Sequence, residues 1–477
     1  MTKFVRQIAA LTLIFGVLAA WPAQAQEKAP RPNILYILSD DQGWKDIGYH
    51  GSDIKTPNID RLAANGTRLE QFYAQPMCTP TRAALMTGRY PFRYGLQTAV
   101  IASPHTYGLP TDEWLLPQAL KEAGYYTAII GKWHLGHADP KYWPRQRGFD
   151  YQYGPMIGEI DYFTHEQHEG VVDWYRNNKK LIEKGYSTTL LGNDAVKLIH
   201  AYDTSKPLYL YLTFNSPHTP YQAPQEYLDK YKDIADPSRR AYAASITAMD
   251  DQIGRVLEAL EKQGMRDNTI VFFQSDNGGT RNKMFAGERA AATIPCNNGP
   301  YREGKGTLYE GGTRVIALVN WPGHIRAGAT ETGMLHVVDM YPTLAALAGA
   351  STAKAKPLDG LNVWATLSEG KLSPRTEVVY NIEPFRAAVR QGDWKLIWRT
   401  TLPSSSELYN IAQDPSEKNN VAAQNPDKTA ALAKRANELA AAGVKPLYLV
   451  TEFQLILQRV AAPAALPGEE FQFDEEQ

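Results

Sequence analysis

Oxygen-bearing side chains recur in this sequence directly after short apolar runs. Asp40 and Asp41 follow one such run, and Asp276 and Asn277 follow another. Carboxylate and amide oxygens are the ligands that hard cations such as Ca²⁺ or Mg²⁺ prefer, whereas softer metals prefer His and Cys. Either pair alone would suit a helix N-cap or a solvated turn equally well. The two pairs together favour a divalent cation site.

A basic set accompanies these carboxylates in the sequence. Its members are Lys132, His134, His218 and Lys305. Beside a cation, two lysines and two histidines suit the binding of a tetrahedral or trigonal oxyanion. The alternative is that each Lys is a solvated side chain and each His a hydrogen-bonded structural residue. That alternative is less convincing for Lys132 and His134, which directly follow a run of strand length.

Cys78 allows three interpretations on spacing alone. It could form a disulfide with Cys296 in an oxidising compartment, remain a buried apolar thiol, or act as a nucleophile. The chain has 2 cysteines. That count excludes a disulfide-built scaffold and a four-cysteine zinc site.

The apolar runs before these residues alternate with helical patterns. Strands are predicted over 33–39, 125–130, 207–213, 269–274 and 313–320, and helices over 114–123 and 238–263. This alternation indicates an α/β fold with a mostly parallel sheet. Ligands bind outside the carboxyl ends of strands in such sheets. The polar clusters should therefore converge on one edge of the sheet.

From about Glu377 the pattern changes. Two further runs flank Gln391-Gly392-Asp393, which is typical of a hairpin. We interpret residues 1–25 as a signal peptide, 26–376 as a catalytic domain, 377–460 as a smaller α+β domain and 461–477 as a loose tail. Within the third part, a hairpin is predicted over 385–390 and 394–398, a strand over 407–411 and a helix over 427–442. The apolar segment 447–460 is either an interface or packs on its own domain.

The N-terminus and the net charge limit the possible locations and partners. Lys3 and Arg6 precede an apolar stretch over 8–21 and a small-residue cleavage site, Ala23-Gln24-Ala25, which is typical of a secretory signal. The apolar stretch is shorter than the roughly 20 residues that a membrane span needs. We therefore expect a periplasmic or secreted protein without a stable membrane anchor. The formal net charge of -1 lacks the basic surplus of nucleic-acid-binding proteins.

Two extended motifs resemble the signatures of the type I sulfatases. The first is Cys78-Thr-Pro-Thr-Arg82 with Leu-Met-Thr-Gly at 85–88, and the second is the stretch 124–134. In that family, Cys-x-Pro-x-Arg directs oxidation of the cysteine to formylglycine. The resemblance runs from about 33 to 420 and implies an alkaline phosphatase-like α/β sandwich. Segments at 146–150, 158–166 and 358–370 most resemble the arylsulfatase B, or N-acetylgalactosamine-4-sulfatase, branch.

The resemblance implies hydrolysis of aryl or carbohydrate sulfate monoesters, including glycosaminoglycan sulfates, to an alcohol and inorganic sulfate. The nucleophile would be the gem-diol of formylglycine (3-oxoalanine) made from Cys78 by a separate formylglycine-generating enzyme. Ca²⁺, with Mg²⁺ possible, would be held by Asp40, Asp41, Cys78, Asp276 and Asn277. The catalytic side chains would be Cys78, Arg82, Lys132, His134, His218 and Lys305.

The same resemblance assigns a role to each of these side chains. Asp276 would take the diol proton, and the two lysines would neutralise sulfate oxygens. His218 or Lys305 would protonate the leaving oxygen, and His134 would assist collapse of the diol. Arg82 would hydrogen-bond the diol and brace the carboxylates. A loop with His165, Glu166 and His168 resembles a substrate-side segment.

Two other functions stay open on the sequence. One is hydrolysis of phosphonate or phosphate esters, since relatives in the same superfamily can share formylglycine. The other is non-catalytic binding of sulfated glycans by a decayed site. The sequence does not identify the natural ester or the oligomeric state.

Overall fold

The computed structural model describes residues 31–167, 170–283 and 294–461. The predicted signal peptide and nearly all of the predicted tail lie outside these ranges. A ten-stranded sheet has the order β11-β2-β10-β9-β1-β8-β4-β5-β6-β7. Its strands are β1 (Asn33–Ser39), β2 (Thr67–Leu69), β4 (Tyr126–Gly131), β5 (Tyr151–Gly154), β6 (Tyr175–Arg176), β7 (Lys179–Lys180), β8 (Leu208–Thr213), β9 (Thr269–Ser275), β10 (Ala317–Asn320) and β11 (Ala329–Glu331).

The centre of this sheet is parallel. β9, β1, β8, β4 and β5 all run in one direction, and β10 pairs with β9 in the opposite direction. Because both faces of the central strands are covered, these strands are continuous buried runs, as in β1. The prediction of a mixed, mostly parallel sheet is confirmed.

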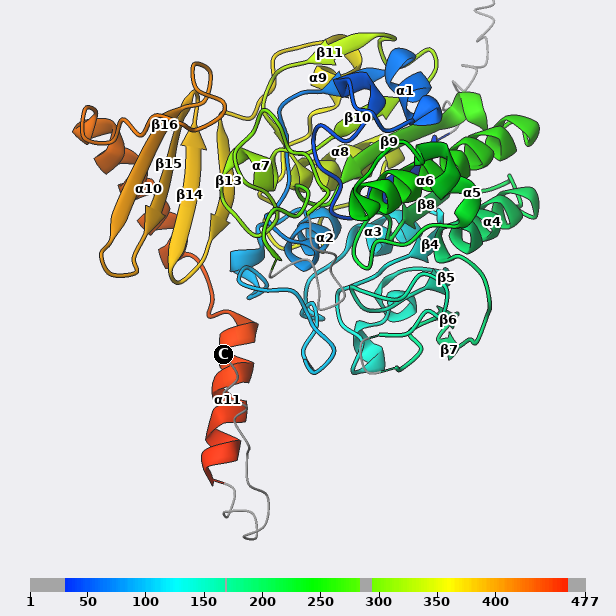
Figure 1. The fold of residues 1–477 in the computed structure, drawn as a ribbon, viewed down its shortest axis with the longest axis horizontal. Helices are drawn as coiled ribbons and strands as arrows, with labels where there is room; N and C mark the ends of the chain where they lie inside the picture. The colour runs from blue at the N-terminus through cyan, green and yellow to red at the C-terminus, as the bar shows by residue number, and fades with distance from the viewer. Residues whose placement is uncertain (1–30, 168–169, 284–293, 462–477) are drawn as a thin grey trace, which may run out of the picture. The chain divides into compact units, whose positions relative to one another are not determined.

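Helices cover both faces of the sheet (Figure 1). They are α1 (Pro57–Ala64), α2 (Cys78–Thr87), α3 (Leu116–Glu122), α4 (Ser187–His200), α5 (Gln225–Leu228), α6 (Pro237–Lys262), α7 (Glu310–Thr313), α8 (Met340–Ala348) and α9 (Trp364–Glu369). Alternate residues of β1 point to opposite sides. Tyr36 and Leu38 join the core formed with α2, α3 and α8, whereas Leu35 and Ile37 join the core formed with α1, α4 and α6.

A second, antiparallel sheet begins at Glu377. It contains β13 (Glu377–Ile382), β14 (Arg386–Gln391), β15 (Trp394–Arg399) and β16 (Ser405–Asn410), in that order. Helix α10 (Pro426–Ala441) packs on it through Leu432, which joins a cluster with Leu396 and Leu408. The smaller antiparallel sheet with its helix agrees with the predicted α+β region, whereas the domain boundaries stay a prediction. Two more elements are the strand pair β3 (Phe72–Tyr73) and β12 (Leu335–His336), and helix α11 (Leu447–Ala461).

Two predicted elements were wrong in extent. The strand predicted over 313–320 is restricted to β10, because Thr313 ends the short helix α7 and the residues between them form a loop. The amide of Val315 in that loop donates to Phe72 O at 3.0 Å, so its apolar residues are buried without joining the large sheet. The helix predicted over 114–123 begins at Leu116, because Leu115 is extended.

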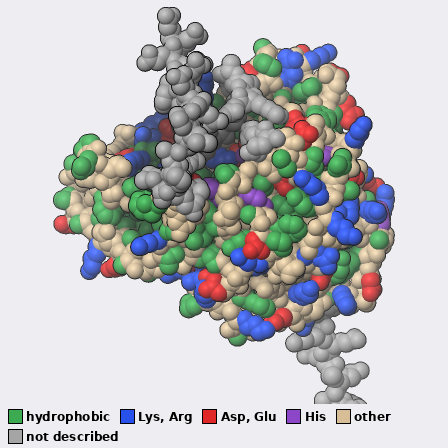
Figure 2. All heavy atoms as spheres, turned by 90° about the horizontal axis from the view of Figure 1, so that it is seen from below, with side chains coloured by type: hydrophobic (Ala, Val, Ile, Leu, Met, Phe, Trp, Pro, Cys, Tyr) green, Lys and Arg blue, Asp and Glu red, His purple; other side chains and the backbone are tan. Residues whose placement is uncertain are grey.

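On the face shown in Figure 2, basic, acidic and apolar side chains lie side by side. Within the described ranges, no helix combines the length and the apolar character that crossing a membrane requires.

Candidate active site

The polar residues that follow the parallel strands meet at one edge of the large sheet. Hydrogen bonds continue past the strand ends: the amide of Asp40 donates to Ser216 O at 3.1 Å, and that of Asp276 donates to Ser39 O at 3.1 Å. The amide of Lys132 donates to the last residue of β8 at 2.9 Å. These bonds fix the backbone at each position, so the side chains emerge together at the carboxyl edge.

Cys78 is the first residue of α2 and lies against two carboxylates. Its Sγ is 3.4 Å from Asp40 Oδ1 and 3.9 Å from Asp41 Oδ1. The preceding residue, Met77, is extended with a φ of -148°, so the helix begins at Cys78 itself. The first turn of a helix carries unpaired amides and a partial positive charge, which favours an anionic group beside it.

Arg82 lies one turn further along α2 and is fully buried. Its Nε and Nη2 donate to Asp276 Oδ2 at 3.3 and 3.0 Å, and its Nη1 donates to Lys132 O at 3.0 Å. Because the guanidinium presents its donors in a rigid plane, one side chain joins the ends of β4 and β9. Arg82 therefore braces the base of the site.

Two lysines pair with the two neighbouring aspartates. Lys132 Nζ is 2.5 Å from Asp40 Oδ2, and Lys305 Nζ is 2.7 Å from Asp41 Oδ2. His218 lies beside the second pair, with Nε2 3.2 Å from Lys305 Nζ. His218 and Lys305 remain 7% and 5% exposed, whereas Asp40 and Lys132 are 0% exposed. The first two thus lie on the solvent side of the site, and the last two lie at its base.

The contacts of His218 indicate which ring nitrogen carries its hydrogen. Nδ1 lies 2.7 Å from the carbonyl oxygen of Thr219, which can only accept, so Nδ1 donates there. Nε2 faces the ammonium group of Lys305, which can only donate, so Nε2 accepts. A hydrogen bond thus joins His218 and Lys305 on the solvent side of the site.

Burial and neighbouring charges oppose each other at Asp40 but act together at Asp276 and Cys78. Burial alone would raise the pKa of Asp40, but the charges of Lys132 and three other basic side chains outweigh it and hold that pKa well below its ordinary value. Burial and the Asp40 carboxylate raise the pKa of Asp276 to about 6. Burial and the charge of Asp276 also raise the pKa of the Cys78 thiol. A plain thiol here stays protonated and is a poor nucleophile.

The residues present fit a divalent cation site. Asp40, Asp41, Cys78 and His218 bring ligand atoms within 4.8 Å of one another, and all four are buried. Asn277 Nδ2 donates to Asp41 Oδ1 at 2.7 Å, whereas its buried Oδ1 has no hydrogen-bond partner in the described part of the chain. An unpaired buried carbonyl is costly, and a cation would supply its missing partner. These carboxylate and amide oxygens are the donor set of a hard cation.

His134 lies beside the same charged groups, in the loop after β4. Its ring contacts Gly158 so closely that a Cβ there would be 2.4 Å from Cε1. Burial and the charge of Lys132 lower the pKa of His134, so the ring is neutral. Its Nδ1 is buried without a hydrogen-bond partner among the described residues. A neutral ring with a free nitrogen can hydrogen-bond a bound group.

Sequence reasoning missed two residues that contact or support the site. Thr280 Oγ1 donates to Asp41 Oδ2 at 3.2 Å. Thr280 directly follows the Asp-Asn-Gly-Gly motif, so extending the motif by one residue would have found it. Asp173 Oδ2 accepts from the amide of Ile157 at 2.7 Å. The carbonyl oxygen of the preceding residue, Met156, accepts from the amide of His134. No motif surrounds Asp173, so the sequence offered no signal for it.

The disulfide that the sequence allowed is absent, since Cys78 and Cys296 are both buried free thiols. Cys296 Sγ lies 3.9 Å from the carbonyl oxygen of Asp41. Cys296 therefore contacts the backbone behind the site as a thiol.

The segment expected to face the substrate is only partly described. His165 is buried, with its ring stacked 4.4 Å from that of Trp174 and its Nε2 3.1 Å from Gly185 O. The ring of His165 is therefore enclosed by its own loop, and contact with a substrate is not supported for it. His168 lies outside the described residues.

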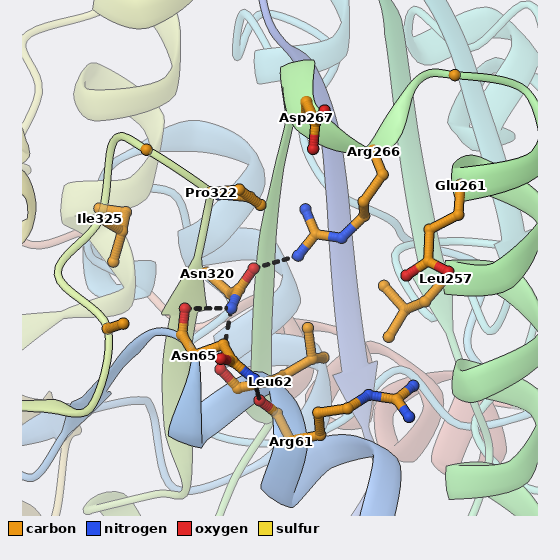
Figure 3. Close-up of a pocket in the computed structure, with 13 residues that line it drawn as sticks. Arg61, Leu62, Asn65, Leu257, Glu261, Arg266, Asp267, Asn320, Pro322 and Ile325 are labelled. Carbon is orange, nitrogen blue, oxygen red and sulfur yellow. Dashed lines mark hydrogen bonds between the residues drawn. The ribbon is translucent and has the colours of Figure 1, made fainter.

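A cavity of about 620 Å³ lies at the opposite edge of the sheet and contains none of the predicted site residues (Figure 3). Asn320 Nδ2 donates to the carbonyls of Leu62 and Asn65 at 3.1 and 2.7 Å, and Arg266 donates to Asn320 Oδ1. These bonds satisfy carbonyls at the end of α1, which would otherwise lack partners. Asn320 and Arg266 thus have a structural role here.

Comparison with known proteins identifies relatives over most of the chain. Residues 32–350 match the Sulfatase family, and residues 303–442 match the family described as N-sulphoglucosamine sulphohydrolase, C-terminal. The chain is 39% identical to arylsulfatase J of Mus musculus over 390 residues, covering 80% of this chain and 63% of that protein. It is 36% identical to N-acetylgalactosamine-6-sulfatase of Homo sapiens over 382 residues, covering 76% and 70%.

Solved structures give a similar result. The crystal structure of Ps i-CgsB in complex with k-i-k-neocarrahexaose aligns with a TM-score of 0.81 and 33% identity. The alignment covers 91% of this chain and 98% of that one. The chain therefore spans less than two thirds of arylsulfatase J but nearly all of this solved structure.

Proposed function

Because the chain belongs to the sulfatase family, we propose that it hydrolyses sulfate monoesters of carbohydrates to an alcohol and inorganic sulfate. The observation that carries the proposal is the arrangement around Cys78. Two carboxylates lie within 3.9 Å of its sulfur, and each is paired with a lysine whose charge can neutralise a sulfate oxygen. The type I sulfatase resemblance of the sequence is confirmed, and the assignment to the arylsulfatase B branch stays a prediction.

The nucleophile in this proposal is formylglycine made from Cys78. The Cys-Thr-Pro-Thr-Arg signature supports the conversion. The raised pKa of the thiol disfavours the unmodified cysteine as the nucleophile. Hydrated formylglycine supplies one hydroxyl that attacks sulfur and a second through which sulfate is released by C–O cleavage. Asp276 accepts the proton of the attacking hydroxyl.

The cation in this proposal is Ca²⁺, with Mg²⁺ as the alternative. Asp40, Asp41, Asp276 and Asn277 would hold it, together with an oxygen of the modified residue. A bound divalent cation polarises a sulfate oxygen and lowers the pKa of a neighbouring hydroxyl. The unpaired Oδ1 of Asn277 supports the assignment.

The basic residues divide into two groups by depth. Lys132, at the base, neutralises a sulfate oxygen, and Arg82 holds Asp276 in place. Lys305 and His218, on the solvent side, face the leaving group. One of these two side chains, His218 or Lys305, protonates the leaving oxygen as a general acid. The neutral ring of His134 hydrogen-bonds the modified residue.

The substrate class follows from the relatives. One relative is named N-acetylgalactosamine-6-sulfatase, and one solved structure is of a complex with k-i-k-neocarrahexaose. Both names refer to carbohydrates, and we propose a sulfated galactose-type sugar as the substrate. The protein would be exported to the periplasm or secreted, after a separate formylglycine-generating enzyme has modified Cys78.

Sulfate release by protein produced together with a formylglycine-generating enzyme tests the proposal. We expect the wild type to hydrolyse an aryl sulfate and Cys78→Ala to be inactive. Mass spectrometry of the peptide that spans position 78 should detect an aldehyde. Activity in Cys78→Ala, or an unmodified thiol in active protein, would contradict the mechanism. A large preference for a matched aryl phosphonate would contradict the reaction class.

A further inference from the structure

A second cavity, of about 500 Å³, lies between the last turn of α4 and the first residues of β4 and β5. Because Lys132 follows the other end of β4, this cavity is at the opposite edge of the sheet from the site around Cys78. Its lining is rich in aromatic and charged side chains: Tyr126, Tyr151, Arg176, Asp194, Lys197, Tyr202, Asp203 and Lys206.

Three tyrosines form the aromatic part of the lining. The rings of Tyr126 and Tyr202 lie 5.6 Å apart at 53° and are partly exposed. Tyr202 Oη donates to Lys206 O at 3.0 Å, and Tyr151 Oη donates to Asp194 Oδ2 at 2.7 Å. These hydrogen bonds hold two of the rings in place, so an aromatic surface is ready before a ligand binds. Such rings pack well on the C–H face of a sugar.

The cavity carries more basic than acidic side chains, with Arg176, Lys197 and Lys206 against Asp194 and Asp203. Asp194 is paired with Arg176 at 2.6 Å, and Asp203 accepts from Ser205 and interacts with the charge of Lys206. Lys197 and Lys206 are exposed, and within the described ranges neither forms an ion pair. Two exposed ammonium groups beside aromatic rings, in a lining with one more basic than acidic side chain, suit a ligand that is both anionic and carbohydrate.

We propose that this cavity binds a sulfated sugar unit of a polymeric substrate, remote from the catalytic site. The inference rests on the proposed function, because that function supplies the substrate class. Tyr126 and Tyr202 would contact the apolar face of the sugar ring, and Lys197 and Lys206 would contact its sulfate groups. Holding one part of a long chain raises the local concentration of its other sulfate esters near the enzyme.

Charge reversal in the cavity tests the cationic part. Binding is measured by affinity electrophoresis in gels containing carrageenan, with the full chain carrying Cys78→Ala so that the polymer is not cleaved. We expect Lys197→Glu with Lys206→Glu to weaken binding roughly tenfold, as expected for two exposed charge contacts. The matched control is Lys232→Glu with Lys428→Glu, which makes the same change of charge at exposed lysines elsewhere.

The aromatic part has its own pair of variants. Tyr202→Ala should weaken binding, whereas Tyr202→Phe should retain it, because the ring rather than the hydroxyl contacts the sugar. Unsulfated agarose should be bound less well than carrageenan by the parent protein. Equal binding by the cavity variants and the Lys232/Lys428 control would overturn the inference, and so would full binding by Tyr202→Ala.

Turnover separates this inference from the proposed function. With Cys78 present, the cavity variants should hydrolyse a small aryl sulfate at the wild-type rate but release sulfate from the polymer with a raised KM. If the wild type hydrolyses both substrates and the cavity variants match it on both, the inference fails and the proposed function stands. If the wild type releases no sulfate from either, the proposed function fails.

Discussion

Replacing Arg82 with methionine tests whether a single buried guanidinium holds the base of the site together. The side chain is fully buried and contacts Asp276 Oδ2 at 3.0 and 3.3 Å. Arg82→Met keeps most of the volume but leaves the Asp276 carboxylate without this cation. Removing one partner of a buried ion pair costs about 3–5 kcal/mol. We expect the free energy of unfolding to fall by that amount.

The assay compares Cys78→Ala with Cys78→Ala/Arg82→Met. The shared Cys78→Ala substitution is needed because Arg82 belongs to the signature for modification, so maturation would otherwise differ between the variants. Urea unfolding is followed by tryptophan fluorescence, with EDTA present so that cation binding does not contribute. Arg82→Lys keeps the charge but loses the paired donors, and we expect an intermediate loss.

Arg375→Met is a matched control away from the site. Arg375 is also buried, and its Nε donates to Asp339 Oδ2 at 2.8 Å. We expect a similar loss of stability, but, in the presence of Cys78, retained turnover by the folded protein. If Cys78→Ala/Arg82→Met unfolded at the same urea concentration as Cys78→Ala, the assignment of Arg82 as the brace of the site would be refuted.

Three other predictions concern proton transfer, the cation and pH. His218→Ala should lose roughly 10²–10⁴-fold in kcat on a sugar sulfate but much less on 4-nitrophenyl sulfate, whose leaving group needs no proton. Equal losses in the two assays would exclude the general-acid role for His218. EDTA should abolish sulfate release, and added Ca²⁺ should restore it. Asn277→Ala should need a higher Ca²⁺ concentration to reach half of its own maximal activity. Sulfate release that survives EDTA would argue against the cation. Burial, with the nearby charge of Glu310, raises the pKa of Glu417 to about 7. The folded protein binds the proton of Glu417 more tightly than the unfolded chain does, so this group stabilises the fold when protonated, and the contribution is lost as the pH rises from about 5 through 7. The urea midpoint of the wild type should therefore fall over that range more than the midpoint of Glu417→Gln. Parallel curves for the two proteins would show that Glu417 does not titrate in this way.

The sequence predicted the central strands because each is a continuous apolar run of strand length. It also placed the polar clusters after those runs, and the parallel arrangement then brings them to one edge. The prediction over 313–320 was wrong because burial alone does not distinguish a strand from a buried loop. In the structure, that loop packs beside β3 before the chain enters β10.

The sequence by itself determined the family, the modification signature at Cys78 and the strand ends that carry the carboxylates, because these depend on residues close together in the chain. Only the tertiary structure decided that Lys305 pairs with Asp41 and that His218 Nε2 accepts from Lys305. It also decided that Cys78 and Cys296 form no disulfide. Contacts between segments far apart in sequence depend on how the sheet and its loops pack, and spacing along the chain does not encode those distances.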